Sequence, residues 1–297
     1  MVAWFADLSN FSHLTHEITE RERAGPELVG QLLNETFGQI IEQVTSYGGE
    51  VLEFAGDSVL ATWTINAERD RVQALKLASS CGLEVLELKL PEVYADRPLD
   101  LRVGIGVGTG VLMEVGGVDQ LWHFVVGGPP FSQIGLASNV ARPGEVVLSP
   151  EATDSIGSAA RGRVDEEGFL RLTQVDDGEP PNIARRSEMN DHLTTELRRF
   201  LPPPVLRRID AGQSEWLAEF RQVTSVFVNL PRLDPTTTSA RDTLQDLVTK
   251  TQVALAKYEG TLTRILDDDK GVTLFASFGL PPFAHEEDPY LAVQAAE

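Results

Sequence analysis

The sequence predicts an α+β fold, with a largely antiparallel sheet covered by helices and two pseudo-repeated modules. Over the first half, apolar strand-like runs alternate with helical stretches in the order β-α-β-β-α-β, which is typical of helices packed on a sheet. A Gly-Asp turn separates the apolar runs at 50–55 and 58–64 and indicates an antiparallel hairpin. Motifs of the first half return in the second, and such repetition indicates duplicated modules.

The other elements of the first module follow from periodicity and turn residues. A strand opens at Val2 and leads into a turn that can start a helix. Residues 26–46 carry an apolar helical stripe that ends at Tyr47-Gly-Gly49, and helical periodicity returns over 66–88. The strand at 99–108 contains glycines that allow close backbone approach. Further strands are expected over 111–115, 121–126 and 144–149, and a helix from Gly127-Gly-Pro-Pro130 to about Val140.

The chain then loses its regular pattern before the motifs return. Residues 150–190 are weakly patterned, and the proline-rich run Phe200-Leu-Pro-Pro-Pro204 indicates a connector. We therefore predict a first module at 1–189, a linker arm at 190–217 and an incomplete second module at 218–297.

The second module repeats three features of the first. Ser225-Val-Phe-Val-Asn229-Leu230 repeats the first strand with Asn229 in place of Asp7. Tyr258-Glu-Gly260 repeats Tyr47-Gly-Gly49, and counting on from each tyrosine places Arg264 opposite Glu53. A strand over 272–277 and a helix from about Asp288 complete the visible part.

Composition excludes several classes of protein. The formal net charge of −20 argues against nonspecific binding of nucleic acid or of an anionic membrane, which require a basic face. The single cysteine, Cys81, excludes a disulfide within the chain and a cysteine zinc site. No apolar run is long enough to span a membrane and no signal peptide precedes the first strand, so we expect a cytoplasmic protein without membrane insertion.

Two aspartates carry the functional prediction. Asp7 and Asp57 each follow an apolar run that reads as a buried strand. Carboxylate oxygens brought together at strand ends suit a hard divalent cation that binds a polyphosphate. The sequence alone therefore predicts a metal-assisted phosphate site.

The motifs resemble those of class III nucleotidyl cyclases, most closely the soluble adenylyl cyclase type with tandem cyclase domains. The resemblance rests on Phe5-Ala-Asp7-Leu-Ser-Asn-Phe11, Gly48-Gly-Glu-Val-Leu-Glu-Phe-Ala-Gly-Asp57, Leu101-Arg102-Val-Gly-Ile-Gly106 and Ser225-Val-Phe-Val-Asn229-Leu. It implies cyclase homology domains of the ferredoxin-like or palm type, which pair within the chain. It also implies conversion of ATP to cyclic AMP and pyrophosphate between the two modules.

The resemblance also implies roles for individual residues. Asp7 and Asp57, with the backbone carbonyl of Leu8, would hold two divalent cations, Mg²⁺ or Mn²⁺. Arg102 would bind the phosphates, and Arg264 stands where adenylyl cyclases carry a lysine that contacts the purine. The substrate phosphates would also meet backbone N–H groups of the turn at Asn10, Phe11 and Ser12, where a helix N-terminus favours anions.

The resemblance leaves two alternatives open. The family's transition-state Asn and Arg should lie beyond residue 297, so this stretch alone is expected to be weakly active or inactive, with possible regulatory domains downstream. A non-catalytic nucleotide-binding or regulatory module is therefore one alternative. Guanylate cyclase specificity is the other, because guanylyl cyclases carry a glutamate at the position of Glu53, although Ser132 and Leu136 argue against a catalytic homodimer of the first module.

Overall fold

The computed structural model describes residues 1–21, 25–66, 70–88, 100–176, 195–212, 222–230, 233–268, 271–280 and 285–297. The chain divides into two compact units, Met1–Gly110 with Pro129–Arg186 and Val111–Gly128 with Ser187–Glu297, called here the first and second unit. The segment Val111–Gly128 thus groups with the second half of the chain. The module boundaries expected at 189 and 217 stay a prediction.

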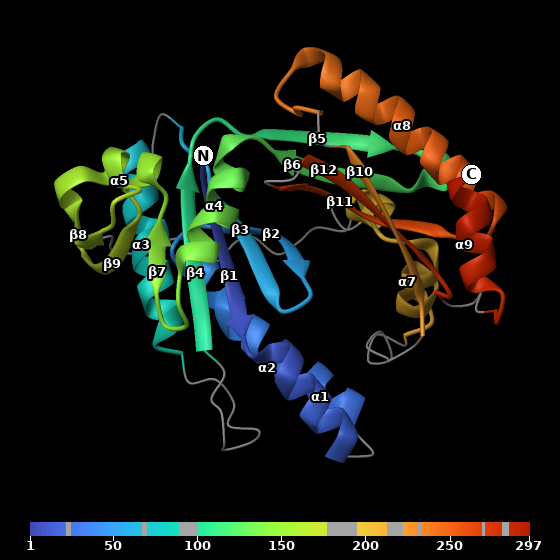
Figure 1. Ribbon diagram of the computed structural model, residues 1–297, viewed down its shortest axis with the longest axis horizontal. Coiled ribbons are helices and arrows are strands. Elements are labelled where there is room, and N and C mark those ends of the chain that lie inside the picture. The colour runs from blue at the N-terminus through green and yellow to red at the C-terminus, as the bar shows by residue number, and fades with distance from the viewer. Residues whose placement is uncertain are drawn as a thin grey trace. The chain divides into compact units, whose positions relative to one another are not determined.

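The first unit is built on one sheet with the strand order β2-β3-β1-β4-β7-β9-β8, and the first four of these strands lie side by side in Figure 1. Its strands are β1 (Val2–Ser9), β2 (Glu50–Ala55), β3 (Ser58–Trp63), β4 (Asp100–Val107), β7 (Val146–Leu148), β8 (Ala160–Val164) and β9 (Leu170–Val175). Its helices are α1 (Phe11–Arg21), α2 (Gly25–Ser46), α3 (Arg71–Leu86), α4 (Pro129–Val140) and α5 (Pro150–Ile156), with the short turn η2 (Gly157–Ala159).

The pairing confirms the predicted fold class. Of the strand pairs that the structure describes in this sheet, only β4 with β7 is parallel. The predicted hairpin at 50–64, the helix at 26–46 and the strands at 99–108 and 144–149 are all present. Helix α3 begins later than expected, with Asp70 as its N-cap, and residues 67–69 lie outside the described part of the chain.

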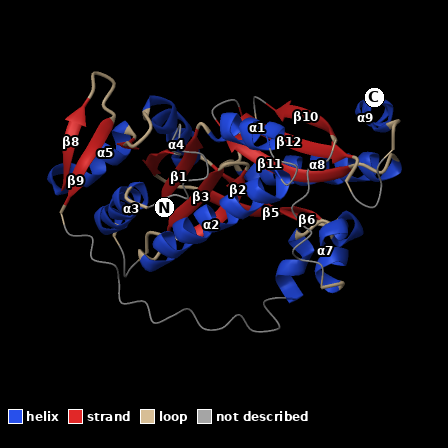
Figure 2. Ribbon diagram, turned by 90° about the horizontal axis from the view of Figure 1, so that it is seen from below, coloured by secondary structure: helices blue, strands red, loops and turns tan. Residues whose placement is uncertain are grey.

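The two faces of the sheet carry different layers. Val2, Trp4, Ala6 and Leu8 alternate along β1 and pack in one core cluster with residues of α2 and α3. Figure 2 shows helices α2 and α4 on opposite sides of β1. Helix α4 lies against the opposite face. Its backbone comes so close to β4 that an added Cβ at Gly104 would lie 2.6 Å from a backbone oxygen of the helix. The glycines of β4 therefore allow the close backbone approach that the sequence predicts.

The weakly patterned region contains elements that the sequence did not predict. Helix α5 begins at Pro150 with Ser149 as its N-cap, and β8 and β9 form an antiparallel hairpin. Most of β8 is exposed on both faces, so its sequence lacks the apolar alternation that identifies a strand. Residues 177–190 of this region lie outside the described residues.

The second unit contains a sheet with the strand order β10-β12-β11 and the separate hairpin of β5 and β6. Its strands are β5 (Val111–Gly116), β6 (Trp122–Gly127), β10 (Thr224–Leu230), β11 (Thr261–Asp268) and β12 (Gly271–Phe278). Its helices are α7 (Pro203–Asp210), α8 (Thr238–Lys257) and α9 (Asp288–Ala296), with the short turns η1 (Val118–Gln120) and η3 (Arg198–Phe200). In Figure 1, α8 lies along β5. No helix among the described residues is both long and apolar enough to cross a membrane.

The internal repeat extends to strand register. Strand β1 pairs Val2 with Trp63 on β3, and β10 pairs Thr224 with Phe278 on β12. Five positions along each strand, Asp7 lies opposite Ser58 and Asn229 opposite Thr273. Asp7 and Asn229 therefore occupy equivalent positions in their sheets.

The glycine motifs of the repeat are equivalent as well. An added Cβ at Gly49 would lie 2.6 Å from the ring of Trp63, and one at Gly260 would lie 2.6 Å from the ring of Phe278. Because these aromatic residues also occupy equivalent register positions, each module uses a glycine to admit the same ring at the helix–strand turn.

The β5–β6 hairpin, called here the arm, is fixed within the second unit. Met113, Val115 and Val125 belong to the same core cluster as residues of α8 and β11. Gln245 of α8 accepts a hydrogen bond from the Gly116 amide at 3.0 Å and donates one to the Gly116 carbonyl at 2.8 Å. The inner face of the arm is therefore buried against the second half of the chain.

The outer face of the β5–β6 arm contacts the segment that was predicted as the linker between the modules. Arg199 of η3 forms an ion pair with Glu114 at 2.6 Å, and its guanidinium carbon lies 5.7 Å from the Trp122 ring centroid. The rings of Phe124 and Phe200 meet edge to face at 6.4 Å. Within the predicted linker, residues 190–194 and 213–217 lie outside the described part of the chain.

Candidate functional site

Strand pairing brings Asp7 and Asp57 together at one end of β1 and β3. Asp7 lies opposite Ser58, the residue that follows Asp57 in the β2–β3 turn. That turn requires Gly56, whose φ of 66° lies in the left-handed region. The Leu8 amide donates a hydrogen bond to the Asp57 carbonyl at 3.1 Å, which closes the gap between the two segments. The two predicted carboxylates are therefore neighbours in the same unit.

The charges at this end of the sheet act on one another. Arg102 lies opposite Asp7 on the other neighbouring strand, β4, and its Nε and Nη2 donate to one Asp7 carboxylate oxygen at 2.8 and 2.5 Å. Burial raises the pKa of Asp57, and the Asp7 carboxylate raises it further, while the Asp57 backbone amide and Arg102 oppose the shift. Two carboxylates and one guanidinium thus form a single electrostatic group.

The contact between Arg102 and Asp7 was not predicted from the sequence. The resemblance assigns Arg102 to the substrate phosphates, whereas in the structure this arginine also pairs with a predicted metal ligand. The signal lies in the register of β1 against β4, which neither strand reveals by itself.

The predicted phosphate turn links the same end of β1 to helix α1. Asn10 adopts a φ of 67°, a conformation that asparagine tolerates better than most residues. Its carbonyl accepts the first hydrogen bond of α1, from the Leu14 amide at 3.0 Å. The amides of Phe11 and Ser12 lie in the first turn, where N–H groups lack intrahelical partners and the helix dipole favours anions.

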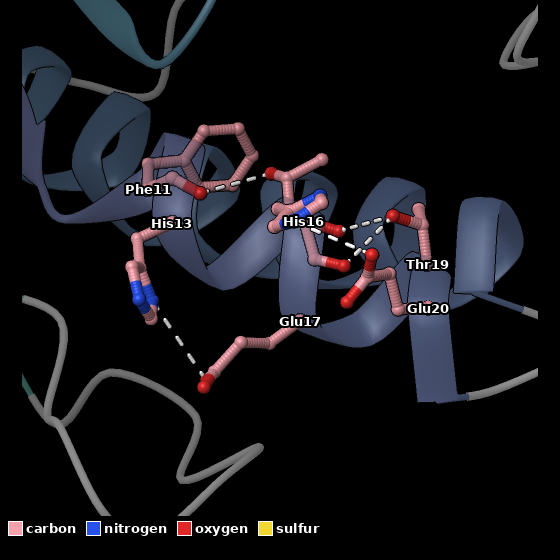
Figure 3. Close-up of polar contacts among 7 residues, drawn as sticks. Phe11, His13, His16, Glu17, Thr19 and Glu20 are labelled. Atoms are coloured by element: carbon pink, nitrogen blue, oxygen red, sulfur yellow. Dashed lines mark hydrogen bonds and ion pairs between the residues drawn. The ribbon is translucent and has the colours of Figure 1, made fainter.

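The histidines that follow this turn belong to the exposed surface of α1. The imidazoles of His13 and His16 lie 3.9 and 3.5 Å from the carboxylates of Glu17 and Glu20, one turn further along the helix (Figure 3). Their side chains are 52% and 70% exposed, which excludes them from a buried ligand set. Figure 3 also shows Thr19, whose hydroxyl bonds back to the His16 carbonyl.

The donor set at Asp7 and Asp57 fits a hard divalent cation. Both side chains offer carboxylate oxygens, the ligands that Mg²⁺ and Mn²⁺ prefer. No group of three or more His, Cys, Asp or Glu side chains with metal-binding geometry occurs in the described ranges. A cation here would therefore depend on two carboxylates together with backbone, water or substrate oxygens, as is usual for Mg²⁺ at phosphate sites.

The remaining predicted residue, Arg264, belongs to the second unit. It lies on β11 opposite Phe275 of β12, one strand removed from Asn229 of β10. Glu53 occupies the corresponding position in the first unit, on β2 opposite Leu60 of β3. The structure thus places both candidate purine-contact residues at matching positions in the two sheets.

The comparison with known proteins agrees with the motifs. The chain is 29% identical to adenylate cyclase type 10 of Oryctolagus cuniculus and 28% identical to that of Homo sapiens, in each case over 94% of this chain and 19% of the relative. It thus spans about a fifth of the length of these relatives. The guanylyl cyclase Cya2 structure matches with a TM-score of 0.46 and 22% identity, covering 61% of this chain and 94% of Cya2.

A family model matches more than half of the chain. The model describes the adenylate and guanylate cyclase catalytic domain and covers residues 2–173, which include β1, the β2–β3 hairpin and β4. The chain belongs to the adenylate and guanylate cyclase catalytic domain family.

Proposed function

We propose that this chain is the catalytic region of an adenylate cyclase that converts ATP to cyclic AMP and pyrophosphate. The proposal rests above all on the juxtaposition of Asp7 and Asp57 beside Arg102 at one end of the sheet. In the reaction, the ribose 3′-oxygen forms a bond to the α-phosphorus while the bond from that phosphorus to the pyrophosphate oxygen breaks. The 3′-hydroxyl proton passes to a base.

The residues of the first unit suit the phosphate end of this substrate. Two Mg²⁺ or Mn²⁺ ions at Asp7 and Asp57, with the Leu8 carbonyl as a further ligand, would lower the pKa of the 3′-hydroxyl and neutralise charge on the triphosphate. Arg102 pairs with Asp7 and presents a fork of donors suited to phosphate oxygens. The first-turn amides of α1 offer further donors to the same group.

The second unit supplies the proposed purine contact. Arg264 keeps a donor for an adenine ring nitrogen, although its planar fork differs from the ammonium of a lysine. We further propose that the two modules pair within the chain. The arm supports this, because it lies within the family-matched residues 2–173 yet is buried against α8 and β11. The name of the type 10 relatives supports ATP as the substrate.

The test measures cyclic AMP formed from ATP with Mg²⁺ or Mn²⁺. Asp57→Asn should reduce product by at least a hundredfold, because a neutral amide weakens binding of a divalent cation. Asp154→Asn is the matched control, since Asp154 is an exposed aspartate on helix α5 of the same unit, away from the end of the sheet that carries Asp57, and should leave turnover unchanged. Measurable cyclic AMP formation by wild type that Asp57→Asn matches would refute the proposed metal role.

Glu53 favours guanylate cyclase activity as a second candidate. It lies at the register position equivalent to Arg264, and a glutamate there can accept hydrogen bonds from guanine. The same assay with GTP as the substrate distinguishes guanylate cyclase activity from adenylate cyclase activity. Cyclic GMP as the main product, lost in Glu53→Lys and retained in Arg264→Ala, would favour GTP as the substrate.

A further inference from the structure

The β11–β12 hairpin of the second unit has an irregular strand register. Leu262 pairs with Ala276, yet the next pair joins Arg264 to Phe275. Thr263 is therefore an extra residue that has no partner of its own, which defines a β-bulge. Bulges re-aim the side chains that follow them.

The burial of the neighbouring residues shows on which face of the sheet the bulge places Arg264. Leu262 and Ile265 both belong to the core cluster of the second unit and are 1% and 5% exposed. In an unbroken strand, residues three positions apart lie on opposite faces. The bulge therefore places both Thr263 and Arg264 on the face away from the core. Without it, Arg264 would take a core position.

That face also carries the second unit's counterpart of Asp7. Val226 and Leu230 of β10 pack against the core cluster, so Phe227 and Asn229 lie on the other face with Arg264. The ring of Phe227 lies 4.8 Å from that of Phe275, the strand partner of Arg264. The bulge thus brings the proposed purine contact to the face that corresponds to the metal-binding face of the first unit.

The first unit contains the same irregularity at the equivalent place. Val51 pairs with Ala61 and Glu53 with Leu60, so Leu52 is the extra residue. Val51 packs against the core, and Phe54 stacks on a ring of α2, so Glu53 is also turned away from the core. The bulge is therefore part of the repeated module.

The second unit fixes its bulge with a side chain. The Thr263 hydroxyl donates a hydrogen bond to the Phe275 carbonyl at 2.9 Å, across the strand pair that carries Arg264. The equivalent Leu52 has no polar atom with which to form this bond. The module with the purine-contact arginine thus has a bond that holds the shifted register.

We propose that Thr263 is a positioning residue that holds Arg264 toward the purine of the bound nucleotide. The proposal rests on the proposed function, since it concerns the same nucleotide site. By fixing the bulge, Thr263 keeps the Arg264 guanidinium on the nucleotide face and determines how well it distinguishes adenine from guanine. Thr263 itself does not contact the purine.

The test compares dissociation constants of fluorescent N-methylanthraniloyl ATP and GTP in the presence of Mn²⁺. Thr263→Val keeps the shape and β-branching but removes the hydroxyl, and should weaken ATP binding about fivefold, the effect of one ordinary hydrogen bond. It should leave GTP binding within twofold, so that the preference for ATP narrows. Thr263→Ser should restore the preference, and Thr261→Val, on the same strand, should leave it unchanged.

Amide hydrogen exchange provides a second measurement that does not require nucleotide. Exchange over 262–266 should be faster in Thr263→Val than in wild type and Thr261→Val, while α8 keeps its protection. Unchanged nucleotide preference and unchanged exchange in Thr263→Val would overturn the inference alone. Failure of the wild type to bind either nucleotide would refute the proposed function, and this inference with it.

Discussion

Lowering the pH should destabilise the second unit through one buried histidine. His123 on β6 lies opposite Val115 and is 8% exposed, and its Nε2 has no hydrogen-bond partner among the described residues. Burial lowers the pKa of His123 from 6.5 to about 4. The imidazole is therefore neutral in the folded protein at pH values where the unfolded chain already binds a proton.

The direction and the size of the stability change follow from the difference between the folded and unfolded pKa values of His123. Because the folded pKa lies below the unfolded one, the stability contribution is complete above pH 6.5 and is lost as the pH falls toward 4. At about 1.4 kcal/mol per pKa unit, the loss approaches about 3 kcal/mol. The arm is the affected element, so its packing against α8 and β11 should weaken first.

Urea unfolding between pH 8 and pH 4 measures this contribution. His123→Leu removes the titrating group, and its free energy of unfolding should fall less with acid than that of wild type, by about 3 kcal/mol. All other titratable groups are the same in the two proteins, so the difference between their unfolding free energies isolates the contribution of His123. Identical pH dependence for wild type and His123→Leu would refute the reasoning.

Three further predictions follow from backbone and packing. Gly49→Ala and Gly260→Ala should each lower the free energy of unfolding by about 1–3 kcal/mol in denaturant titrations, because the new methyl group overlaps an aromatic ring, whereas Gly38→Ala meets open space and should not destabilise. Asn10→Ala should cost about 1 kcal/mol in the same assay and Asn10→Gly close to nothing, since φ is positive there; equal losses would contradict this. Arg199→Ala should cost about 1 kcal/mol, and a double-mutant cycle with its glutamate partner on β5 should show coupling; additive effects would mean that the ion pair is inactive.

The parts of the fold that could be predicted are those with strong local patterns. The β2–β3 hairpin carries both a Gly-Asp turn and apolar runs, and helix α2 carries a full apolar stripe, so both match their predicted positions closely. Strand β8 is mostly exposed and therefore carries no such pattern. The burial of the arm against α8 depends on contacts between distant segments, such as Gln252 donating to Leu121, which no local window contains.

The candidate site divides in the same way. Each aspartate could be placed at a strand end from its own segment, and the β1–β3 pairing then makes them neighbours. The Asp7–Arg102 contact and the two bulges depend on register, which is a property of strand pairs. Asn10 can be interpreted from its conformation alone, because its φ of 67° lies in the left-handed region that asparagine tolerates better than most residues.

The two modules present the same face with opposite chemistry. At two equivalent strand positions, the first unit holds Asp7 and Glu53, which are both acidic. The second unit holds Asn229 and Arg264 there, which are neutral and basic. Two copies of the first module would give every such position a carboxylate, which suits cations but leaves no arginine for the base. Two copies of the second would lack the proposed metal ligands. Because a shared backbone, bulge included, carries both sets, duplication followed by substitution at a few positions of this face is sufficient to divide the proposed phosphate binding from the proposed base recognition.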